Sequence, residues 1–339
     1  FLPLDSLRYC RKNLRKWMKP RRRGTSVWFA PASNRVLAQP KGVVGVIAPW
    51  NYPLFLVVSP LASAFAAGNR CMVKMASNSQ NLCRLFARLV SERFDEDTLA
   101  VLPGVRASEF TPLPWDHLVF TGSPRTGREV MKTAAAHLTP VTLELGGKSP
   151  TIVREDVSID MAAERILFVK AMNAGQTCVA PDYVLVTENT KQALVAALIE
   201  QFENFFQGNP ENSDSYSRII NEKHLERLSE SLEDATSRGA KILYGGNFDA
   251  GTRFFGPTMI EGIPEDARLL EEEIFGPILP IVTVSGVEEA VSFINRRERP
   301  LALYIYSKNK STIRQINEKT RAGSGCINHN VVHYSNHHL

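Results

Sequence analysis

Short apolar runs alternate with amphipathic segments along the first half of the chain. The β-branched run at residues 42–48 is typical of a strand that is buried on both faces, and helical and extended patterns then follow in turn. Such alternation predicts a doubly wound α/β sheet. The expected strands are 42–48, 71–74 and 115–120, and the expected helices are 60–67, 80–94 and 125–136.

The same alternation restarts after Thr142, which predicts a second α/β domain. Two domains also suit the 339-residue length, because a single hydrophobic core stops growing at about 250–300 residues. The glycine pair at 146–147 lies between the two patterns and is expected to act as a hinge. The later expected strands are 149–153, 183–186, 241–244, 278–284 and 301–307, and the later expected helices are 161–172, 191–206 and 222–238.

Positive charge is concentrated near the start of the chain. Nine basic residues and no acidic one lie between Arg8 and Arg23, whereas the whole chain has a formal net charge of only +5, so the remainder is mildly acidic. One interpretation is an arm that binds nucleic acid. We favour the solvated face of a terminal helix, because Leu7, Leu14 and Trp17 supply an apolar side, and we therefore expect no nucleic-acid partner.

Cysteine spacing and hydropathy indicate a reducing compartment. The five cysteines are scattered, without the pairing of a zinc ribbon or the density of a secreted disulfide scaffold. No signal-peptide pattern opens the chain, and the longest apolar stretch, 52–68, contains two prolines and is shorter than the about 20 residues that span a bilayer. We expect a cytoplasmic protein without membrane contact. The cysteines are Cys10, Cys71, Cys83, Cys178 and Cys326.

Cys178 lies in a segment between an expected helix and an expected strand, residues 175–182. Rigid elements on both sides hold such a loop, and a thiolate there is a good nucleophile. A single cysteine is more often a small buried apolar residue, so this segment alone leaves both interpretations open.

Two further polar residues suit a nucleophilic thiol. Glu144 lies among leucines, where desolvation would raise its pKa toward the range of a general base; the alternative is a half-exposed strand carboxylate paired with Lys148. Asn51 lies between Pro49 and Pro53, and its amide N–H would donate to a developing oxyanion, unless it is only a turn residue.

Residues 120–127 are typical of a strand that turns on Gly122 and Ser123 into a helix. Free backbone N–H groups and the helix dipole make such a helix start suitable for a pyrophosphate. The segment is not the GxGxxG fingerprint, and an ordinary serine-capped helix is an equal alternative.

Together these segments resemble the aldehyde dehydrogenase superfamily over nearly the whole chain. The interval of 34 residues from Glu144 to Cys178 agrees with that family as well. Finer features, at residues 137–142, 178–182, 218–221 and 299–304, resemble the class 3 branch and the bacterial coniferyl aldehyde dehydrogenases. The main matching segments are 49–53, Lys74, Gly122 with Ser123, 143–150, 175–178 and 273–277.

The resemblance implies an oxidation that passes through one thiol. Cys178 would attack the aldehyde to give a thiohemiacetal, whose oxyanion Asn51 and the Cys178 backbone N–H would hold. NAD or NADP would take the hydride, leaving a thioester, and Glu144 would activate the water that hydrolyses it. The implied substrate is an aromatic aldehyde, such as coniferyl aldehyde, or a medium to long aliphatic one.

The resemblance also implies a fold and a set of cofactor contacts. It implies a doubly wound, Rossmann-like cofactor domain at 1–26 and 43–145, an oligomerisation β-hairpin at 27–42, a second α/β domain with the thiol at 146–325, and a return strand and loop at 326–339. Relatives of this kind form homodimers or tetramers, and we expect a homodimer. The implied cofactor-binding residues are Trp50, Lys74, Ser77, Gly122, Ser123, Gly127, Leu145, Glu273 and Phe275.

One departure from the family pattern concerns the choice of cofactor. Members commonly carry Lys-Pro-Ser-Glu after the second strand, and the glutamate takes the adenosine ribose hydroxyls. Here the segment is Lys74-Met75-Ala76-Ser77. Losing a carboxylate removes repulsion against a 2′-phosphate, which Lys74 would attract, so we expect NADP to be accepted.

Three competing interpretations are weaker. Cys326, His329, His333, His337 and His338 resemble a metal cluster by composition, but they show no CxxC or HExxH pattern, and we expect no metal. A CoA-acylating dehydrogenase usually lacks the glutamate found at Glu144. A catalytically silent scaffold on the same fold does not explain why Cys178, Glu144 and Asn51 occur together.

Overall fold

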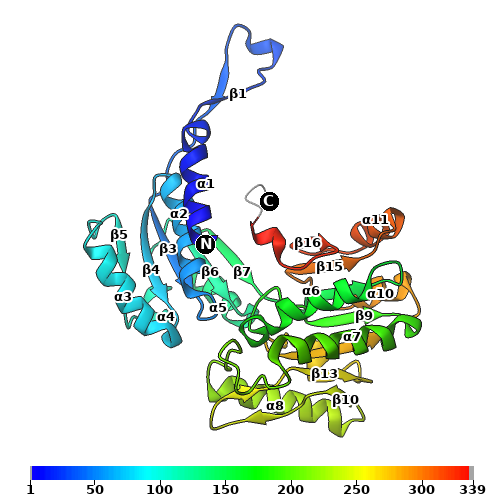
Figure 1. The fold of residues 1–339 in the computed structure, drawn as a ribbon. Helices are drawn as coiled ribbons and strands as arrows, with labels where there is room; N and C mark the ends of the chain where they lie inside the picture. The colour runs from blue at the N-terminus through cyan, green and yellow to red at the C-terminus, as the bar shows by residue number, and fades with distance from the viewer. Residues whose placement is uncertain (1, 336–339) are drawn as a thin grey trace. The chain divides into compact units, whose positions relative to one another are not determined.

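The computed structural model describes residues 2–335, and the chain forms two compact units, Phe1–Leu145 (unit 1) and Gly146–Leu339 (unit 2) (Figure 1). The boundary between them falls immediately before the glycine pair at 146–147. Both units are built on largely parallel sheets with helices, so the predicted α/β fold class is confirmed. None of the described helices is long and apolar enough to cross a membrane.

A five-stranded parallel sheet in the order β5-β4-β3-β6-β7 forms the centre of unit 1. From β3 the chain adds β4 and then β5 on one side of the sheet, and it then adds β6 and β7 on the other side. This is the doubly wound order, with its switch point between β3 and β6. The strands are β3 (Val43–Ala48), β4 (Arg70–Met75), β5 (Leu99–Val101), β6 (His117–Gly122) and β7 (Val141–Leu145).

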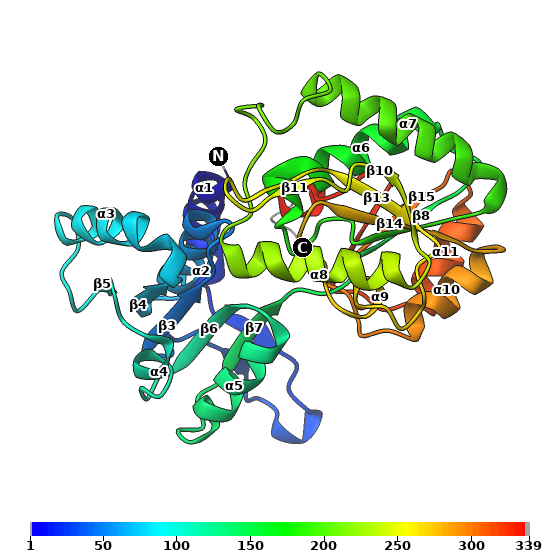
Figure 2. The ribbon, with the colours of Figure 1, turned by 90° about the horizontal axis from the view of Figure 1, so that it is seen from below.

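Helices cover both faces of this sheet. Val44 and Val46 of β3 pack with α2 (Pro53–Ala66) and α3 (Gln80–Ser91), whereas Ile47 packs with the opposite layer. That layer contains α4 (Ala107–Phe110) and α5 (Pro124–Ala135), and Figure 2 shows α3 and α5 on opposite sides of the strands. Burial on both faces explains why β3 is an unbroken apolar run.

Helix α2 begins earlier than the sequence pattern predicts. The predicted start was Pro60, but the helix starts at Pro53, and Pro60 lies inside it. A proline at the first helical position is favourable because its missing N–H has no partner there in any helix. Either Pro53 or Pro60 could mark the start of a helix. The Leu56 N–H donates to the Tyr52 oxygen at 3.0 Å, which shows that the helix begins at Pro53.

The start of unit 1 corrects two expectations. Helix α1 (Leu2–Trp17) contains only part of the basic run, because Arg21–Arg23 form strand β1. β1 pairs with β2 (Asn34–Val36), and η1 (Val27–Phe29) lies in the loop between them. The hairpin strands therefore begin before the predicted bounds of 27–42. In Figure 1 the hairpin projects beyond α1.

A seven-stranded sheet in the order β10-β13-β14-β9-β8-β15-β16 forms the centre of unit 2. Only β10 is antiparallel to its neighbour. Helices α6 (Ile159–Ala171) and α7 (Glu188–Phe206) pack on one face, and α10 (Val287–Asn295) and α11 (Lys310–Lys319) pack on the other. The strands are β8 (Pro150–Val153), β9 (Tyr183–Val186), β10 (Lys241–Tyr244), β13 (Thr258–Glu261), β14 (Ile278–Thr283), β15 (Ala302–Tyr306) and β16 (Ser324–Ile327).

Shorter elements complete unit 2. The helix α8 (Glu222–Ser237) packs into the same apolar cluster as α6 and α7. The remaining elements are η3 (Met172–Gly175), β11 (Phe248–Asp249), β12 (Phe254–Phe255), α9 (Arg268–Glu271) and η4 (Val332–Ser335).

Candidate active site

Cys178 lies in the connection between η3 and β9 and keeps part of its surface exposed, while its neighbours in the loop are buried. Gln176 is only 2% exposed and fastens this loop. Its side-chain amide donates to the Asn173 and Arg218 oxygens at 2.9 and 3.0 Å, and its oxygen accepts from the Ile220 N–H at 2.9 Å. The thiol is thus presented on a fixed backbone, as nucleophilic catalysis requires.

The backbone just before the thiol is strained. Asn173 and Ala174 have φ values of 53° and 50°, in the left-handed region that L-residues rarely adopt. Gly175 follows with φ +72°, and a Cβ there would lie 2.2 Å from the Gly276 oxygen. Glycine is therefore required at 175 both by conformation and by the close approach of the chain that carries Phe275.

A buried ion pair fixes the other end of the loop. Lys148 and Asp182 form a salt bridge with 6% and 5% of their side chains exposed. The Lys148 ammonium also donates to the Leu269 and Glu272 oxygens at 2.7 and 2.8 Å, which uses all three of its donors. Lys148 therefore pairs with Asp182, and the alternative pairing with Glu144 that the sequence left open is wrong.

The same network holds the segment around Glu273. The second Asp182 oxygen accepts from the Ile274 N–H at 2.9 Å, and Arg227 donates to the Glu273 and Ile274 oxygens at 3.3 and 2.5 Å. Glu273 is therefore clamped through its backbone. Phe275, which follows in this segment, has φ 46°.

The Glu273 carboxylate lies against the start of unit 2. A Cβ on Gly146 would lie 2.2 Å from its Oε2, so a side chain at 146 would occupy the carboxylate position. Burial, followed by the nearby Asp182, raises the pKa of Glu273 to about 7, although the Gly147 N–H and Lys148 oppose the shift. The carboxylate is thus poised to accept a hydrogen bond or to hold a proton near neutral pH.

In unit 1, Trp50 and Asn51 follow the end of β3, and both are half-buried. Asn51 comes two residues before the first residue of α2. Gly122 ends the neighbouring strand β6, and the two strands are parallel, so these residues lie at the same edge of the sheet. This edge is the switch point, where doubly wound sheets bind their ligands.

Ser123 is the N-cap of α5, and its hydroxyl accepts from the Thr126 N–H at 3.3 Å. The serine-capped helix and the pyrophosphate site are therefore compatible interpretations, because the cap fills one donor and leaves the helix dipole at the switch point. Gly127 serves packing: a Cβ there would lie 2.8 Å from the Leu145 side chain.

Lys74 lies on β4, the strand beside β3, and is half-buried. Burial lowers the pKa of Lys74. Ser77 begins η2 (Ser77–Ser79), just beyond the end of β4, and is exposed. Lys74 lies near the carboxyl end of β4 and Ser77 lies just beyond it, at the sheet edge where β3 also ends.

Glu144 lies on the edge strand β7, and the leucines beside it do not bury it. Leu143 and Leu145 face the cluster with α5, whereas Glu144 points to the opposite face and is exposed. Successive side chains on a strand alternate between faces, so the sequence neighbours of a strand residue are not its surroundings. The pKa of Glu144 is nevertheless raised by partial burial, as its proposed role as a base requires.

Two tyrosines near the thiol are not among the predicted site residues. Tyr304 on β15 donates to the Val179 oxygen at 2.6 Å, next to Cys178. The Tyr334 hydroxyl on η4 lies 3.6 Å from the Cys178 sulfur. Tyr304 falls in the matching segment 299–304, but no local pattern indicates that either tyrosine lies near the thiol, because the tertiary fold brings each of them to the loop.

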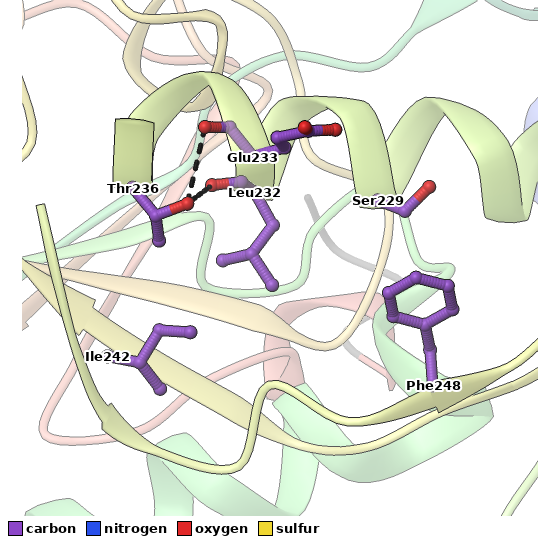
Figure 3. Close-up of a pocket in the computed structure, with 6 residues that line it drawn as sticks. All are labelled: Ser229, Leu232, Glu233, Thr236, Ile242 and Phe248. Carbon is purple, nitrogen blue, oxygen red and sulfur yellow. Dashed lines mark hydrogen bonds between the residues drawn. The ribbon is translucent and has the colours of Figure 1, made fainter. Parts of the chain in front are cut away.

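Two other features were candidates for a functional site: the histidine-rich end of the chain and a surface pocket. Among residues 2–335, no group of three His, Cys, Asp or Glu residues is arranged to hold a metal ion, and His337 and His338 lie outside the described residues. A shallow apolar pocket lies between α8 and the strands β10 and β11 (Figure 3). Its lining contains none of the predicted site residues: it is formed by Ser229, Leu232, Glu233, Thr236, Ile242 and Phe248.

The residues of unit 1 fit a dinucleotide. The sheet has the doubly wound strand order, a capped helix starts at the switch point, and a lysine lies one strand away. In unit 2, a thiol and a carboxylate lie on clamped segments. This combination is typical of an oxidoreductase that uses a nucleotide cofactor and a covalent thiol intermediate.

Comparison with known proteins agrees with this class. Residues 3–338 match the Aldehyde dehydrogenase family. A probable coniferyl aldehyde dehydrogenase from Pseudomonas aeruginosa is 45% identical over 334 residues, which cover 97% of this chain and 69% of that protein. The chain belongs to the aldehyde dehydrogenase family.

Two solved structures share the fold. Staphylococcus aureus AldH in a substrate-bound state has a TM-score of 0.94 and 40% sequence identity, covering 100% of this chain and 74% of that one. An aldehyde dehydrogenase from Mycobacterium tuberculosis complexed with NAD+ has a TM-score of 0.87 and 30% identity, covering 98% of this chain and 69% of that one.

Proposed function

We propose that this protein oxidises an aldehyde to the carboxylic acid with NAD or NADP, through a thioester on Cys178. One observation carries the proposal: a family match that spans both units contains a partly exposed cysteine in an otherwise buried loop. A strained loop that is fixed at both ends and presents one partly exposed thiol is typical of a functional site and not of an inert cysteine.

The proposed roles follow from the chemistry of each side chain. Cys178 attacks the carbonyl carbon, and Asn51 with the Cys178 N–H holds the resulting oxyanion. Glu144 removes a proton from the water that hydrolyses the thioester, and its raised pKa suits a base that works near neutral pH.

The remaining proposed roles concern the cofactor. When bound, NAD or NADP accepts the hydride that leaves the thiohemiacetal. Glu273 hydrogen-bonds the nicotinamide ribose and Phe275 packs beside it, while Ser123 contacts the pyrophosphate and Lys74 the adenine ribose. Trp50, Ser77, Gly122, Gly127 and Leu145 complete the proposed set. On this basis residues 1–26 and 43–145 form the cofactor domain, and residues 146–325 form the domain that carries the thiol.

The first test is a spectrophotometric assay of reduced cofactor with aromatic and aliphatic aldehydes. Coniferyl aldehyde heads the panel because a similar protein carries that name. We expect turnover in the parent and a loss on the order of 10³-fold or more in Cys178→Ala. A folded parent that is inactive with every aldehyde would contradict the proposal.

Glu144→Gln separates the two chemical steps. Without the base, acylation still proceeds and the thioester accumulates, so reduced cofactor should appear as a burst equal to the enzyme concentration, followed by slow turnover. Intact-protein mass spectrometry should then show the acyl group on Cys178. A variant that shows neither the burst nor the adduct would remove Glu144 from the hydrolytic step.

Cofactor choice is tested at Ser77. We infer that the exposed serine there allows NADP to be used alongside NAD. Ser77→Glu restores a carboxylate opposite a 2′-phosphate, and we expect kcat/KM with NADP to fall about tenfold, equivalent to about 1.4 kcal/mol, while kcat/KM with NAD is kept. Equal losses with both cofactors would show that Ser77 does not discriminate between them.

The hairpin supports a homodimer. Val27, Trp28 and Phe29 at its turn are 80%, 89% and 68% exposed, an apolar cluster that favours a protein partner. We propose that a second copy covers it, and that Trp28→Ser shifts the mass measured by light scattering toward the monomer.

The five free cysteines also support a cytoplasmic location.

A further inference from the structure

The Tyr334 hydroxyl lies 3.6 Å from the Cys178 sulfur, within the range of a hydrogen bond to sulfur. Both residues belong to unit 2, and both pack against its larger apolar cluster together with Val331. Tyr334 comes from η4, which is more than 150 residues further along the chain than the thiol. The contact is therefore a product of the tertiary fold and not of a local turn.

His333 packs on the Tyr334 ring, and two further side chains contact His333. The ring stacks on His333 with centroids 4.8 Å apart and planes at 29°. His333 in turn lies 6.4 Å from the Tyr304 ring, and its Nδ1 is 3.1 Å from the Cys326 sulfur on β16. Burial lowers the pKa of His333 and raises the pKa of Cys326, so the two are neutral near pH 7 and the thiol donates to the imidazole.

The backbone that leads to Tyr334 is strained. Val331 has φ 65°, and a β-branched residue in the left-handed region is a genuine outlier. Asn330 beside it is 2% exposed and accepts the Tyr306 hydroxyl at 2.6 Å, which anchors the turn. Strain of this kind persists only where surrounding contacts impose it, and it is concentrated at functional sites.

A hydroxyl beside a cysteine affects its two protonation states differently. A neutral thiol can donate to the phenol or accept from it, whereas a thiolate can only accept. Hydrogen bonds to charged groups are roughly twice as strong as neutral ones. The phenolic O–H therefore favours the thiolate, which is the nucleophilic form.

Titratable groups are placed against this thiol by two elements. Tyr304 comes from β15 and Tyr334 from η4, with His333 and Cys326 behind them. The Tyr304 hydroxyl already donates to the Val179 oxygen, and burial raises the pKa of Tyr304 well above its usual value, so it stays neutral. The Tyr334 hydroxyl lies within hydrogen-bonding distance of the sulfur.

We propose that Tyr334 donates a hydrogen bond to the Cys178 thiolate and so stabilises the nucleophile, with His333 and Cys326 as positioning residues for its ring. This role rests on the proposed function of Cys178 as the nucleophile. It leaves the overall reaction unchanged, because no proton is transferred to or from the phenol in the catalytic cycle.

The test measures the reactivity of the thiol without the aldehyde reaction. The parent protein and Tyr334→Phe are alkylated with iodoacetamide over a range of pH, and the rate at Cys178 is read from its peptide by mass spectrometry. Cys10 in the same molecule serves as a reference thiol. Tyr244→Phe is the matched control, because it removes a hydroxyl of unit 2 that donates to Glu203 instead.

Loss of a hydrogen bond to a charged group should move the midpoint of the Cys178 profile by about one pH unit upward, and lower its rate below the midpoint about tenfold. Cys10 and the Tyr244→Phe control should keep the parent profile. Cys326→Ala should give a smaller shift in the same direction, because the ring stays but its support is weaker. A Tyr334→Phe profile that coincides with that of the parent would overturn the proposal.

Aldehyde oxidation measured on the same samples separates this proposal from the proposed function. A shifted alkylation profile in a protein that oxidises no aldehyde leaves the thiol contact standing and the function wrong. Normal aldehyde oxidation with an unshifted alkylation profile would support the proposed function and rule out the role of Tyr334. Circular dichroism of each variant shows whether the fold is retained, and Tyr334→Phe keeps the whole ring and its stacking.

Discussion

Lys148→Met is expected to destabilise unit 2 because it leaves three buried acceptors without their donor. The Lys148 ammonium contacts one Asp182 oxygen and the Leu269 and Glu272 carbonyls. Methionine has nearly the same length and shape, so the change removes the charge and the donors with little loss of packing. What remains is a buried carboxylate whose partner is gone.

The expected cost follows from the burial of that pair. Only 6% of the Lys148 side chain and 5% of the Asp182 side chain are exposed, so water cannot replace the lost partner. Removing one member of a buried ion pair typically costs about 3–5 kcal/mol, whereas exposed pairs contribute about 0–1 kcal/mol. Lys191→Met is the matched control, because Lys191 bridges Glu188 and Glu261 with 21% of its side chain exposed.

The assay must report on unit 2. All four tryptophans, Trp17, Trp28, Trp50 and Trp115, lie in unit 1, so their fluorescence follows that unit alone. Urea unfolding is therefore followed by circular dichroism as well, and hydrogen exchange of peptides from β9 and β14 localises the loss. We expect the dichroism midpoint and the exchange protection to fall in Lys148→Met.

The reasoning would be refuted if Lys148→Met lost no more unfolding free energy than Lys191→Met. That outcome would mean that Asp182 finds another donor or is neutral in the folded state. Asp182→Asn distinguishes these cases, because an uncharged amide in a site that already held a neutral acid should cost little.

Three further predictions concern the glycines and the carboxylate of unit 2. Gly146→Ala should leave the fold intact, because the clash is with the flexible end of Glu273, but should raise KM for the cofactor by displacing that carboxylate, which steady-state kinetics checks. Gly175→Ala should destabilise unit 2 by on the order of 3 kcal/mol in urea unfolding, because its Cβ would meet the fixed Gly276 backbone at positive φ. The pKa of Glu273 is raised from 4.5 to about 7, so the folded state binds that proton more tightly than the unfolded state does. The free energy of unfolding should therefore fall by about 3 kcal/mol as the pH rises from about 4.5 to about 7. Thermal unfolding at several pH values should show that Glu273→Gln removes this dependence.

The sequence predicts elements with a clear apolar run between turn residues well and predicts several other elements poorly. Strand β9 agrees at both ends with the predicted 183–186, because its apolar run is bounded by turn residues. The sequence does not predict β5, which has only three residues, or β13, which has polar residues at both ends and so lacks the apolar run of β9. Helix α10 was also missed, although Val287, Ala290, Val291 and Ile294 carry the helical spacing and are all buried.

The sequence indicates which residues belong to the candidate site more readily than it indicates which residues surround them. The motif that contains Lys148 was recognised, but its partner, Asp182, lies 34 residues away and comes near only because β8 pairs with β9. Glu144 shows the opposite difficulty: the adjacent leucines suggest burial, and the alternation of the strand turns them to the other face. The predicted roles of these residues remain predictions, which the variants above test.

Local backbone strain is the feature of the site that no sequence pattern indicates. Asn173, Ala174 and Val331 adopt φ values of 53°, 50° and 65°, at a cost of about 1–2 kcal/mol each, and their residue types do not favour that region, apart from asparagine. The strain lies on two segments that are remote in sequence, one leading to Cys178 and the other to Tyr334. Gln176 fastens the first and Asn330 the second. Both segments lead to the contact between the Cys178 sulfur and the Tyr334 hydroxyl, so the local backbone conformation bears directly on how that contact is held, and no residue pattern in the sequence indicates it.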